Sequence, residues 1–215
     1  MVFLERDSSM YMFVTVSWQI EMKTEKKEKI FKAALNMLKK TGVHGLAMGQ
    51  LSKDSGIAAG TFYHYFSSKD VMLQETYLYC HKRAAAIGAK AVKGDEAYKD
   101  RFTAMVMAWY EHFSKHSAEL HFMQESEAGF SVSHNAIRES RIFYNEVFHF
   151  LNLGIEKSTL RSMDTRLMLN MIFQTVFSVI KFETIFETKF EAAELEAAMD
   201  YCWHGLKQRD KKTKE

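Results

Sequence analysis

The stretch GIAAGTFYHYFSSKD, from Gly56 to Asp70, places a run of small residues directly before a dense group of aromatic ones. Helical spacing predicts one short helix from about Met48 to Ser55 and another from about Ala58 to Phe66. The Ser-Gly-Ile sequence between them predicts a sharp turn, because glycine tolerates the backbone conformation that such a turn needs. Two short helices joined in this way predict a helix-turn-helix.

This arrangement explains why the second helix begins with small residues. Its N-terminal part is the part that enters a DNA major groove, and Ala58, Ala59 and Gly60 let its backbone come close to the bases. Farther along, Phe62 and Phe66 stand four residues apart and are predicted to point inward. The hydroxyl and imidazole groups between them are expected to reach phosphate oxygens.

The predicted DNA contacts follow from this geometry. Base readout is expected from Gln50, Thr61 and His64, and phosphate contacts from Tyr63 and Lys69. Ser67 or Ser68 is expected to cap the next helix, whose free backbone N–H groups also suit a phosphate. The full predicted set is Gln50, Ala59, Gly60, Thr61, Tyr63, His64, Tyr65 and Lys69.

Composition predicts an all-α fold. The 215 residues include no proline and only 10 glycines, and 47% of them are hydrophobic, which is enough for a substantial core. Charge is uneven: residues 23–93 carry 13 Lys and Arg against 5 Asp and Glu, whereas residues 94–215 carry 15 against 19. The basic segment predicts a polyanionic partner, although a solvated charged face would give the same excess.

The N-terminal segment is harder to interpret. A helix is predicted from a Thr24 N-cap to a stop at Gly42. Residues 1–22 alternate in a strand-like way with no second strand to pair with, so they are expected to form a poorly ordered tail or to precede the true start at Met22. Residues 211–215 are expected to form a charged tail.

The segment from Gly42 to Leu73 resembles the DNA-binding region of tetracycline-repressor (TetR) family regulators. The Gly-Ile turn, the Gly-Thr-aromatic-Tyr run, Phe66 and the Ser-Lys-acidic helix start are all in register with that family. The chain departs from it at Ala47 and Ala58, where the family usually has a capping Ser or Thr, and at Ser52, where it usually has Ala. Each missing cap should cost about 1 kcal/mol of local helix stability.

The resemblance implies a domain plan and a function. It implies a DNA-binding domain at 23–70, a connecting helix at 71–93 and a regulatory domain at 94–210 that binds an effector and dimerises. The implied function is a ligand-responsive repressor that binds a palindromic operator in double-stranded DNA as a homodimer and is released by a small apolar or amphipathic effector. The competing hypothesis is a helical small-molecule binding or interaction protein without specific operator binding, which a salt titration on its own promoter against random DNA would distinguish.

Helical stripes suggest where the regulatory sites lie. Effector contacts are predicted at Met105, Trp109, Phe113 and Phe148, although ordinary core packing draws on the same residue types. The apolar helix at 165–186 and the following helix are predicted to build a four-helix dimer interface. Its predicted residues are Leu169, Phe173, Val176, Leu195, Ala198, Met199, Cys202 and Leu206.

Other classes of function lack support in the sequence. His112 and His116 stand four residues apart, as zinc ligands can, but surface histidines have the same spacing and no third ligand is identifiable. Catalytic motifs and cofactor-binding glycine loops are absent from the sequence, so no enzyme and no cofactor is predicted. Cys80 and Cys202 are too few for a disulfide framework and suit a cytoplasmic protein. No apolar run is long enough to span a membrane.

Overall fold

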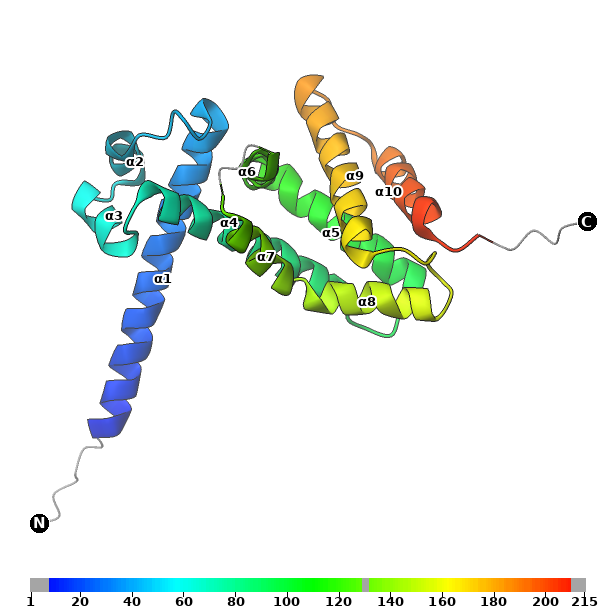
Figure 1. Ribbon diagram of the computed structural model, residues 1–215, viewed down its shortest axis with the longest axis horizontal. Coiled ribbons are helices and arrows are strands. Elements are labelled where there is room, and N and C mark those ends of the chain that lie inside the picture. The colour runs from blue at the N-terminus through cyan, green and yellow to red at the C-terminus, as the bar shows by residue number, and fades with distance from the viewer. Residues whose placement is uncertain (1–7, 129–131, 210–215) are drawn as a thin grey trace, which may run out of the picture. The chain divides into compact units, whose positions relative to one another are not determined.

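The computed structural model describes residues 8–128 and 132–209, and it describes side chains from Glu25 to Ser126 and from Val132 to Arg209. The described residues form α-helices, and their only β pairing is an isolated bridge between Leu160 and Lys207 (Figure 1). The prediction of an all-α fold is confirmed. The helices are α1 (Ser8–Thr41), α2 (Met48–Ser55), α3 (Ala59–Tyr65), α4 (Lys69–Ala91), α5 (Tyr98–Lys115), α6 (Ser117–Ala128), α7 (His134–Ile142), α8 (Asn145–Glu156), α9 (Thr165–Ile185) and α10 (Ala192–Leu206).

The helices divide into two compact units, and the boundary lies inside α4, between Thr76 and Tyr77. We call the residues up to Thr76 the N-terminal unit and those from Tyr77 the C-terminal unit. The helix α4 therefore belongs to both units. Among the described helices, none combines the length and the apolar character needed to cross a bilayer.

The first helix differs from its prediction at one end. It begins at Ser8 rather than after a cap at Thr24, so the predicted N-cap is wrong. No glycine or proline stands between Ser8 and Thr41 to stop a helix. Its predicted stop is confirmed, because Gly42 adopts a left-handed φ of 66° and donates its N–H to the Leu38 carbonyl at 2.8 Å. Residues 8–22 are helical, so the poorly ordered tail expected there is wrong for these residues. Residues 1–7 and the tail at 211–215 lie outside the described residues, and the start at Met22 stays a prediction.

The core of the N-terminal unit lies where α1, α2 and α3 meet. Apolar side chains from each helix are fully buried there, since burying such groups is the main source of stability. An ion pair between Lys27 and Glu75, 2.6 Å apart, joins α1 to the first part of α4. The same ammonium group lies 5.2 Å from the centre of the Phe66 ring. The most buried side chains are Ile30, Leu38, Leu51, Phe62, Phe66 and Met72.

The C-terminal unit is built around α5, which packs against α9 and α10 (Figure 1). One face of α5 is fully buried, and Trp109 lies at its centre. Gly88 lets α4 pass close to this ring, because a Cβ atom at that position would stand only 2.5 Å from Trp109. The second half of α4 is thereby fixed against the core of this unit.

Candidate DNA-binding surface and ligand cavity

The turn between α2 and α3 is held by two serines. Gly56 ends α2 with a left-handed φ of 66°. Ser52 donates its hydroxyl to the Ile57 carbonyl at 2.7 Å, and the Ile57 N–H donates to the Ser55 hydroxyl at 3.2 Å. Both backbone groups of Ile57 are therefore satisfied by side chains of α2, and the start of α3 is fixed relative to that helix.

Neither α2 nor α3 has a side-chain cap. Ala47 and Ala58 occupy the N-cap positions, and neither makes a capping hydrogen bond. The next two residues, Ala59 and Gly60, are exposed, and a Cβ added to Gly60 would meet nothing within 4 Å. The start of α3 is thus a slim, open backbone surface, as the small residues predict.

The aromatic residues of α3 divide between its two faces. Phe62 and Phe66 are buried at 0% and 2% exposure, which confirms that they point inward. Tyr63 is 60% exposed and His64 is also exposed. Thr61 and Tyr65 are half-buried. The outer face of α3 therefore presents hydroxyl and imidazole groups, which are suited to phosphate and base edges.

Two of the predicted DNA contacts already have partners within the protein. Gln50 is exposed and donates to the Asp54 carboxylate at 2.7 Å. Lys69 is half-buried and donates to the Val43 carbonyl at 2.9 Å, so a phosphate would have to share or replace that bond. Of the two serines expected to cap α4, Ser68 does so, because its hydroxyl accepts from the Val71 N–H at 3.2 Å.

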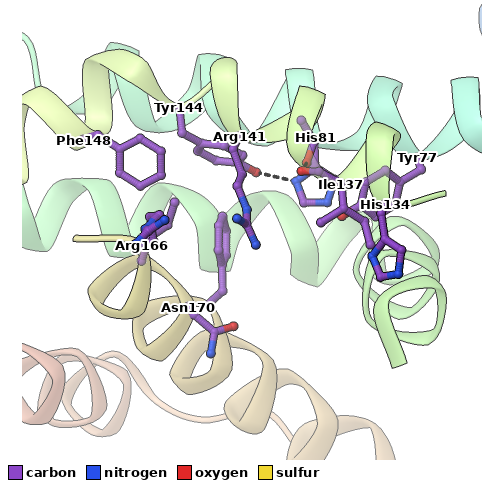
Figure 2. Close-up of a pocket in the computed structure, with 12 residues that line it drawn as sticks. Tyr77, His81, His134, Ile137, Arg141, Tyr144, Phe148, Arg166 and Asn170 are labelled. Carbon is purple, nitrogen blue, oxygen red and sulfur yellow. Dashed lines mark hydrogen bonds between the residues drawn. The ribbon is translucent and has the colours of Figure 1, made fainter. Parts of the chain in front are cut away.

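The C-terminal unit contains a cavity of about 400 Å³ (Figure 2). Residues of α4, α7 and α9 line it, together with Tyr144 and Phe148 at the start of α8. This volume lies within the range of small-molecule sites, about 300–1,000 Å³. The lining residues are Tyr77, His81, His134, Ile137, Ser140, Arg141, Tyr144, Phe148, Arg166, Leu169, Asn170 and Phe173.

A buried polar pair lies on the inner wall of this cavity. The His81 Nδ1 atom and the Tyr144 hydroxyl are hydrogen-bonded at 3.1 Å, and both residues are buried. Burial lowers the pKa of His81 to about 3, so the imidazole is neutral near pH 7. The inner wall therefore offers hydrogen bonding without charge.

The charged groups of the cavity are two arginines. Arg141 comes from α7 and Arg166 from the first turn of α9, and both are exposed. Arg166 pairs with Asp164, with Nε 2.9 Å from one carboxylate oxygen, and this hydrogen bonding holds the pKa of Asp164 well below its usual value. Figure 2 shows the Arg141 side chain extending from α7 toward α9.

The predicted effector contacts are only partly at this cavity. Phe148 lines it, but Met105, Trp109 and Phe113 are fully buried and do not. Trp109 donates its indole N–H to the Ala84 carbonyl at 2.8 Å, and its ring lies 4.6 Å from that of Phe173. These three residues form core behind the cavity wall, so their prediction as direct contacts is corrected.

Most of the cavity residues could not be predicted from the sequence, because they come from segments between Tyr77 and Phe173, up to 96 positions apart. A partial signal existed: Ile137, Arg141, Tyr144 and Phe148 recur at helical spacing and mix polar with aromatic side chains. A helix face that only packs into the core would carry mostly apolar side chains.

The eight predicted dimer residues differ in how far they are buried within the chain. Leu169, Val176, Met199, Cys202 and Leu206 are buried within the chain, and burial raises the pKa of the Cys202 thiol to about 11. Phe173, Leu195 and Ala198 are half-buried. Other large apolar side chains of α9 and α10, and that of Phe186 at the end of α9, are exposed. They are Leu167, Met171, Phe182, Ile185, Phe186 and Tyr201.

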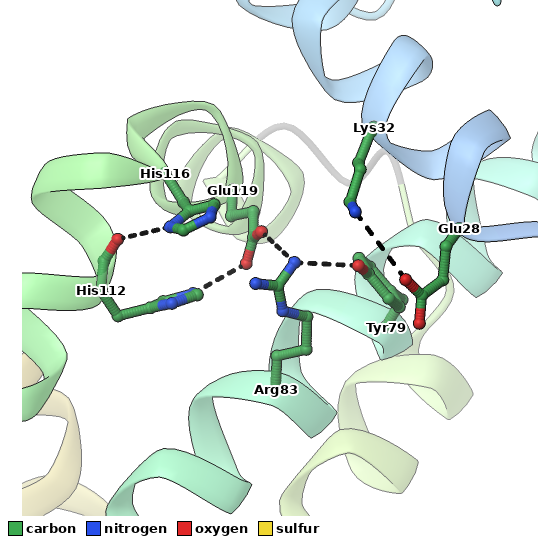
Figure 3. A network of polar contacts seen from close by, with 7 residues as sticks. All are labelled: Glu28, Lys32, Tyr79, Arg83, His112, His116 and Glu119. Carbon is green, nitrogen blue, oxygen red and sulfur yellow. Dashed lines mark hydrogen bonds and ion pairs between the residues drawn. The ribbon is translucent and has the colours of Figure 1, made fainter. Parts of the chain in front are cut away.

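His112 of α5 and His116, the residue that ends this helix, belong to a polar network (Figure 3). Buried Glu119 accepts from Arg83 at 2.8 Å and contacts His112 Nε2 at 3.0 Å. His116 Nδ1 lies 2.9 Å from the His112 carbonyl, and Arg83 also donates to the Tyr79 hydroxyl at 2.9 Å. Over the part of the chain that the structure describes, no group of three or more His, Cys, Asp or Glu is placed to hold a metal ion. The network joins α4 to α5 and α6.

Comparison with known proteins places the helix-turn-helix region. The sequence profile of the bacterial regulatory proteins of the tetR family matches residues 30–76, which contain the helix-turn-helix described above. This part of the chain is therefore similar to the DNA-binding region of TetR-family regulators.

One curated relative gives a match to part of the chain. An uncharacterized HTH-type transcriptional regulator from Haemophilus influenzae is 30% identical over 89 residues, which cover 41% of this chain and 46% of the relative. The match thus spans about half the length of that relative.

Two solved structures show a likeness of fold over most of this chain. A TetR family regulator from Marinobacter aquaeolei shares the fold with a TM-score of 0.81 at 10% identity, over 88% of this chain and 99% of that one. The transcriptional regulator FadR from Bacillus subtilis, in complex with stearoyl-CoA, gives a TM-score of 0.64 at 19% identity, over 82% and 95% of the two chains. At these identities the likeness shows the fold.

Proposed function

We propose that this chain is a TetR-family regulator, a ligand-responsive repressor that binds a palindromic operator as a homodimer and releases it when an amphipathic effector binds. One observation carries the proposal: the helix α4 supplies Tyr77 and His81 to the cavity and begins at Lys69, directly after α3 and its loop. A ligand in the cavity contacts the helix whose first turn belongs to the DNA-binding unit. A change in that helix can therefore link the two sites.

On the DNA side, we propose that the outer face of α3 reads the major groove. Ala59 and Gly60 allow close approach, and Thr61 and His64 contact base edges. The Gln50 amide reads a base from α2 after exchanging its bond with Asp54. Tyr63, Tyr65 and Lys69 are assigned to phosphates. The two recognition helices of a dimer would stand about 34–36 Å apart, one turn of DNA.

We propose that the dimer forms through the exposed face of α9 and α10. Leu167, Met171 and Tyr201 are 50%, 45% and 74% exposed, and large apolar side chains that form a patch on a surface mark interaction sites. Met171→Arg should therefore give a monomer in light scattering, because it would force a charge into an apolar contact. Lys181→Ala on the same helix should leave the dimer intact. A dimer that survives Met171→Arg would move the interface elsewhere.

The effector is proposed to carry a fatty-acyl chain. The size of the cavity and its aromatic and aliphatic lining support this, as does the fold likeness to a regulator solved with stearoyl-CoA. The competing function, a helical binding protein without an operator, predicts DNA binding that shows no sequence preference at physiological salt.

The test is a linkage measurement on the full chain. Affinity for the promoter of its own or a neighbouring gene is compared with that for random DNA, with and without dodecanoyl-CoA. The expected result is specific binding that weakens by about 5- to 150-fold with the ligand, and an equal loss of ligand affinity when DNA is present. Equal ligand affinity with and without DNA would overturn the mechanism.

A further inference from the structure

The charge distribution around the cavity is one-sided. Of the twelve residues that line the cavity, two are arginines and none is acidic. His81 is neutral near pH 7 because burial lowers its pKa to about 3. Apart from His134, the rest of the lining is aromatic, aliphatic or polar without an ionisable group. A ligand that carries positive charge is therefore disfavoured, and an apolar body is favoured.

The two arginines are not equivalent. Arg166 is already occupied by Asp164, which it contacts through Nε at 2.9 and 3.1 Å. Among the described residues, no acidic side chain lies within ion-pair distance of Arg141. Arg141 is exposed, and its side chain extends from α7 toward Asn170 and the start of α9 (Figure 2). The uncompensated positive charge of the cavity is thus at Arg141.

The surroundings of Arg141 suit an oxyanion. A guanidinium donates two parallel hydrogen bonds to a carboxylate or phosphate, which an alcohol or ester cannot accept with equal strength. Asn170 also lines the cavity, is exposed and carries an amide donor. Phe148, Leu169 and Phe173 line the same cavity and offer apolar contacts to the remainder of the ligand.

We propose that the cavity binds an anionic amphipath, with its carboxylate or phosphate on Arg141 and its apolar tail against Phe148, Leu169 and Phe173. This inference rests on the proposed effector site and makes its chemistry specific: the head group must be an oxyanion. The free carboxylate of a fatty acid and the phosphates of an acyl-CoA share this chemistry.

The experiment is calorimetric titration of the full chain, without DNA, by dodecanoate, dodecanoyl-CoA and 1-dodecanol. The wild type should bind at least one of the two anions more tightly than the alcohol. Arg141→Gln should weaken anion binding about tenfold or more, as expected for the loss of hydrogen bonds to a charged group, and should leave 1-dodecanol binding within about twofold. The anion that loses affinity identifies the source of the head group.

The matched control is Arg138→Gln, one turn earlier on α7. Arg138 is exposed, hydrogen-bonds to Asn135 and does not line the cavity, so this variant should bind all three ligands as the wild type does. Equal weakening by both substitutions, equal wild-type affinity for the alcohol and the anions, or no binding of any of the three would overturn the inference. Anion binding through Arg141 that leaves operator affinity unchanged would instead count against the release mechanism alone.

Discussion

The DNA-binding surface and the ligand cavity are assembled in opposite ways. All the residues assigned to DNA lie between Gln50 and Lys69, whereas those that line the cavity come from α4, α7, α8 and α9, between Tyr77 and Phe173. The first site is created by a local turn and two short helices. The second exists only after distant helices have packed together. This difference decides which of the two sites a sequence reveals.

The two regions also differ in how they are stabilised. The turn before α3 depends on hydrogen bonds from Ser52 and Ser55, while the adjacent helix starts at Ala47 and Ala58 lack caps. The cavity wall depends on buried aromatic packing, with Trp109 fully enclosed. We therefore expect substitutions behind the cavity to change stability far more than substitutions on the DNA-binding face.

The largest effect is expected from Trp109→Ala. It removes a fully buried ring and its hydrogen bond to Ala84, so the free energy of unfolding should fall by about 3–5 kcal/mol. Urea unfolding followed by circular dichroism measures this change. The matched substitution on the other region is Tyr63→Ala, which truncates a side chain that is 60% exposed and should change stability by no more than about 0.5 kcal/mol.

This pair of variants also tests the prediction from the sequence that Trp109 contacts the effector. If Trp109→Ala left the unfolding midpoint unchanged and weakened only ligand binding, the ring would be part of the site rather than of the core. The expectation that substitutions behind the cavity change stability more than substitutions on the DNA-binding face would then be wrong.

The sequence predicted the DNA-binding region well because its signals are local. Gly56 at the turn and the inward pair Phe62 and Phe66 follow from backbone preference and helical spacing. Lys69 was harder to predict, since its bond to the Val43 carbonyl spans 26 positions. Such a contact depends on how the chain folds back, which spacing alone does not contain.

The regulatory region was predicted only in outline, for the same reason. Apolar stripes predicted where the helices lie, but each helix has several apolar positions, and only packing decides which face the core, the cavity or the solvent. Val176 and Met199 are core, while Met171 and Tyr201 on the same helices are exposed. Arg141 and His81 line the same cavity although they are sixty positions apart in the sequence, so no local pattern joins them.

A second prediction concerns acid and the cavity wall. The pKa of His81 is lowered from 6.5 to about 3 by burial, so between these values the unfolded chain binds more protons than the folded one. This contribution to stability is complete above pH 6.5 and is lost as the pH falls toward 3. At pH 5 the loss should be about 2 kcal/mol relative to pH 7, at about 1.4 kcal/mol per pH unit.

His81→Gln isolates this contribution from other titrating groups. Urea midpoints of the wild type and the variant are measured at pH 7 and pH 5, and the variant should lose less stability on acidification. Parallel losses in the two proteins would show that His81 is not the responsible group.

The smallest effect is expected at the uncapped start of α3. Ala58 stands at the N-cap, with φ −56° and ψ 140°, and has no side-chain oxygen to accept from the Gly60 N–H, while the Thr61 N–H donates to the Ala58 carbonyl at 2.8 Å. Ala58→Ser supplies that acceptor and should stabilise the N-terminal unit by about 1 kcal/mol, measured by hydrogen exchange of α3 amides. Ala59→Ser is the matched control, because a serine one position later lies inside the helix and cannot cap it.

If the added hydroxyl also reaches a phosphate, Ala58→Ser raises affinity for all DNA sequences alike and leaves base preference unchanged. If Ala58→Ser and Ala59→Ser increased the stability of the N-terminal unit equally, capping would not be the cause. The stability of the DNA-binding region would then not depend on a local cap at this position, and the contrast with the cavity, which depends on packing, would not hold there.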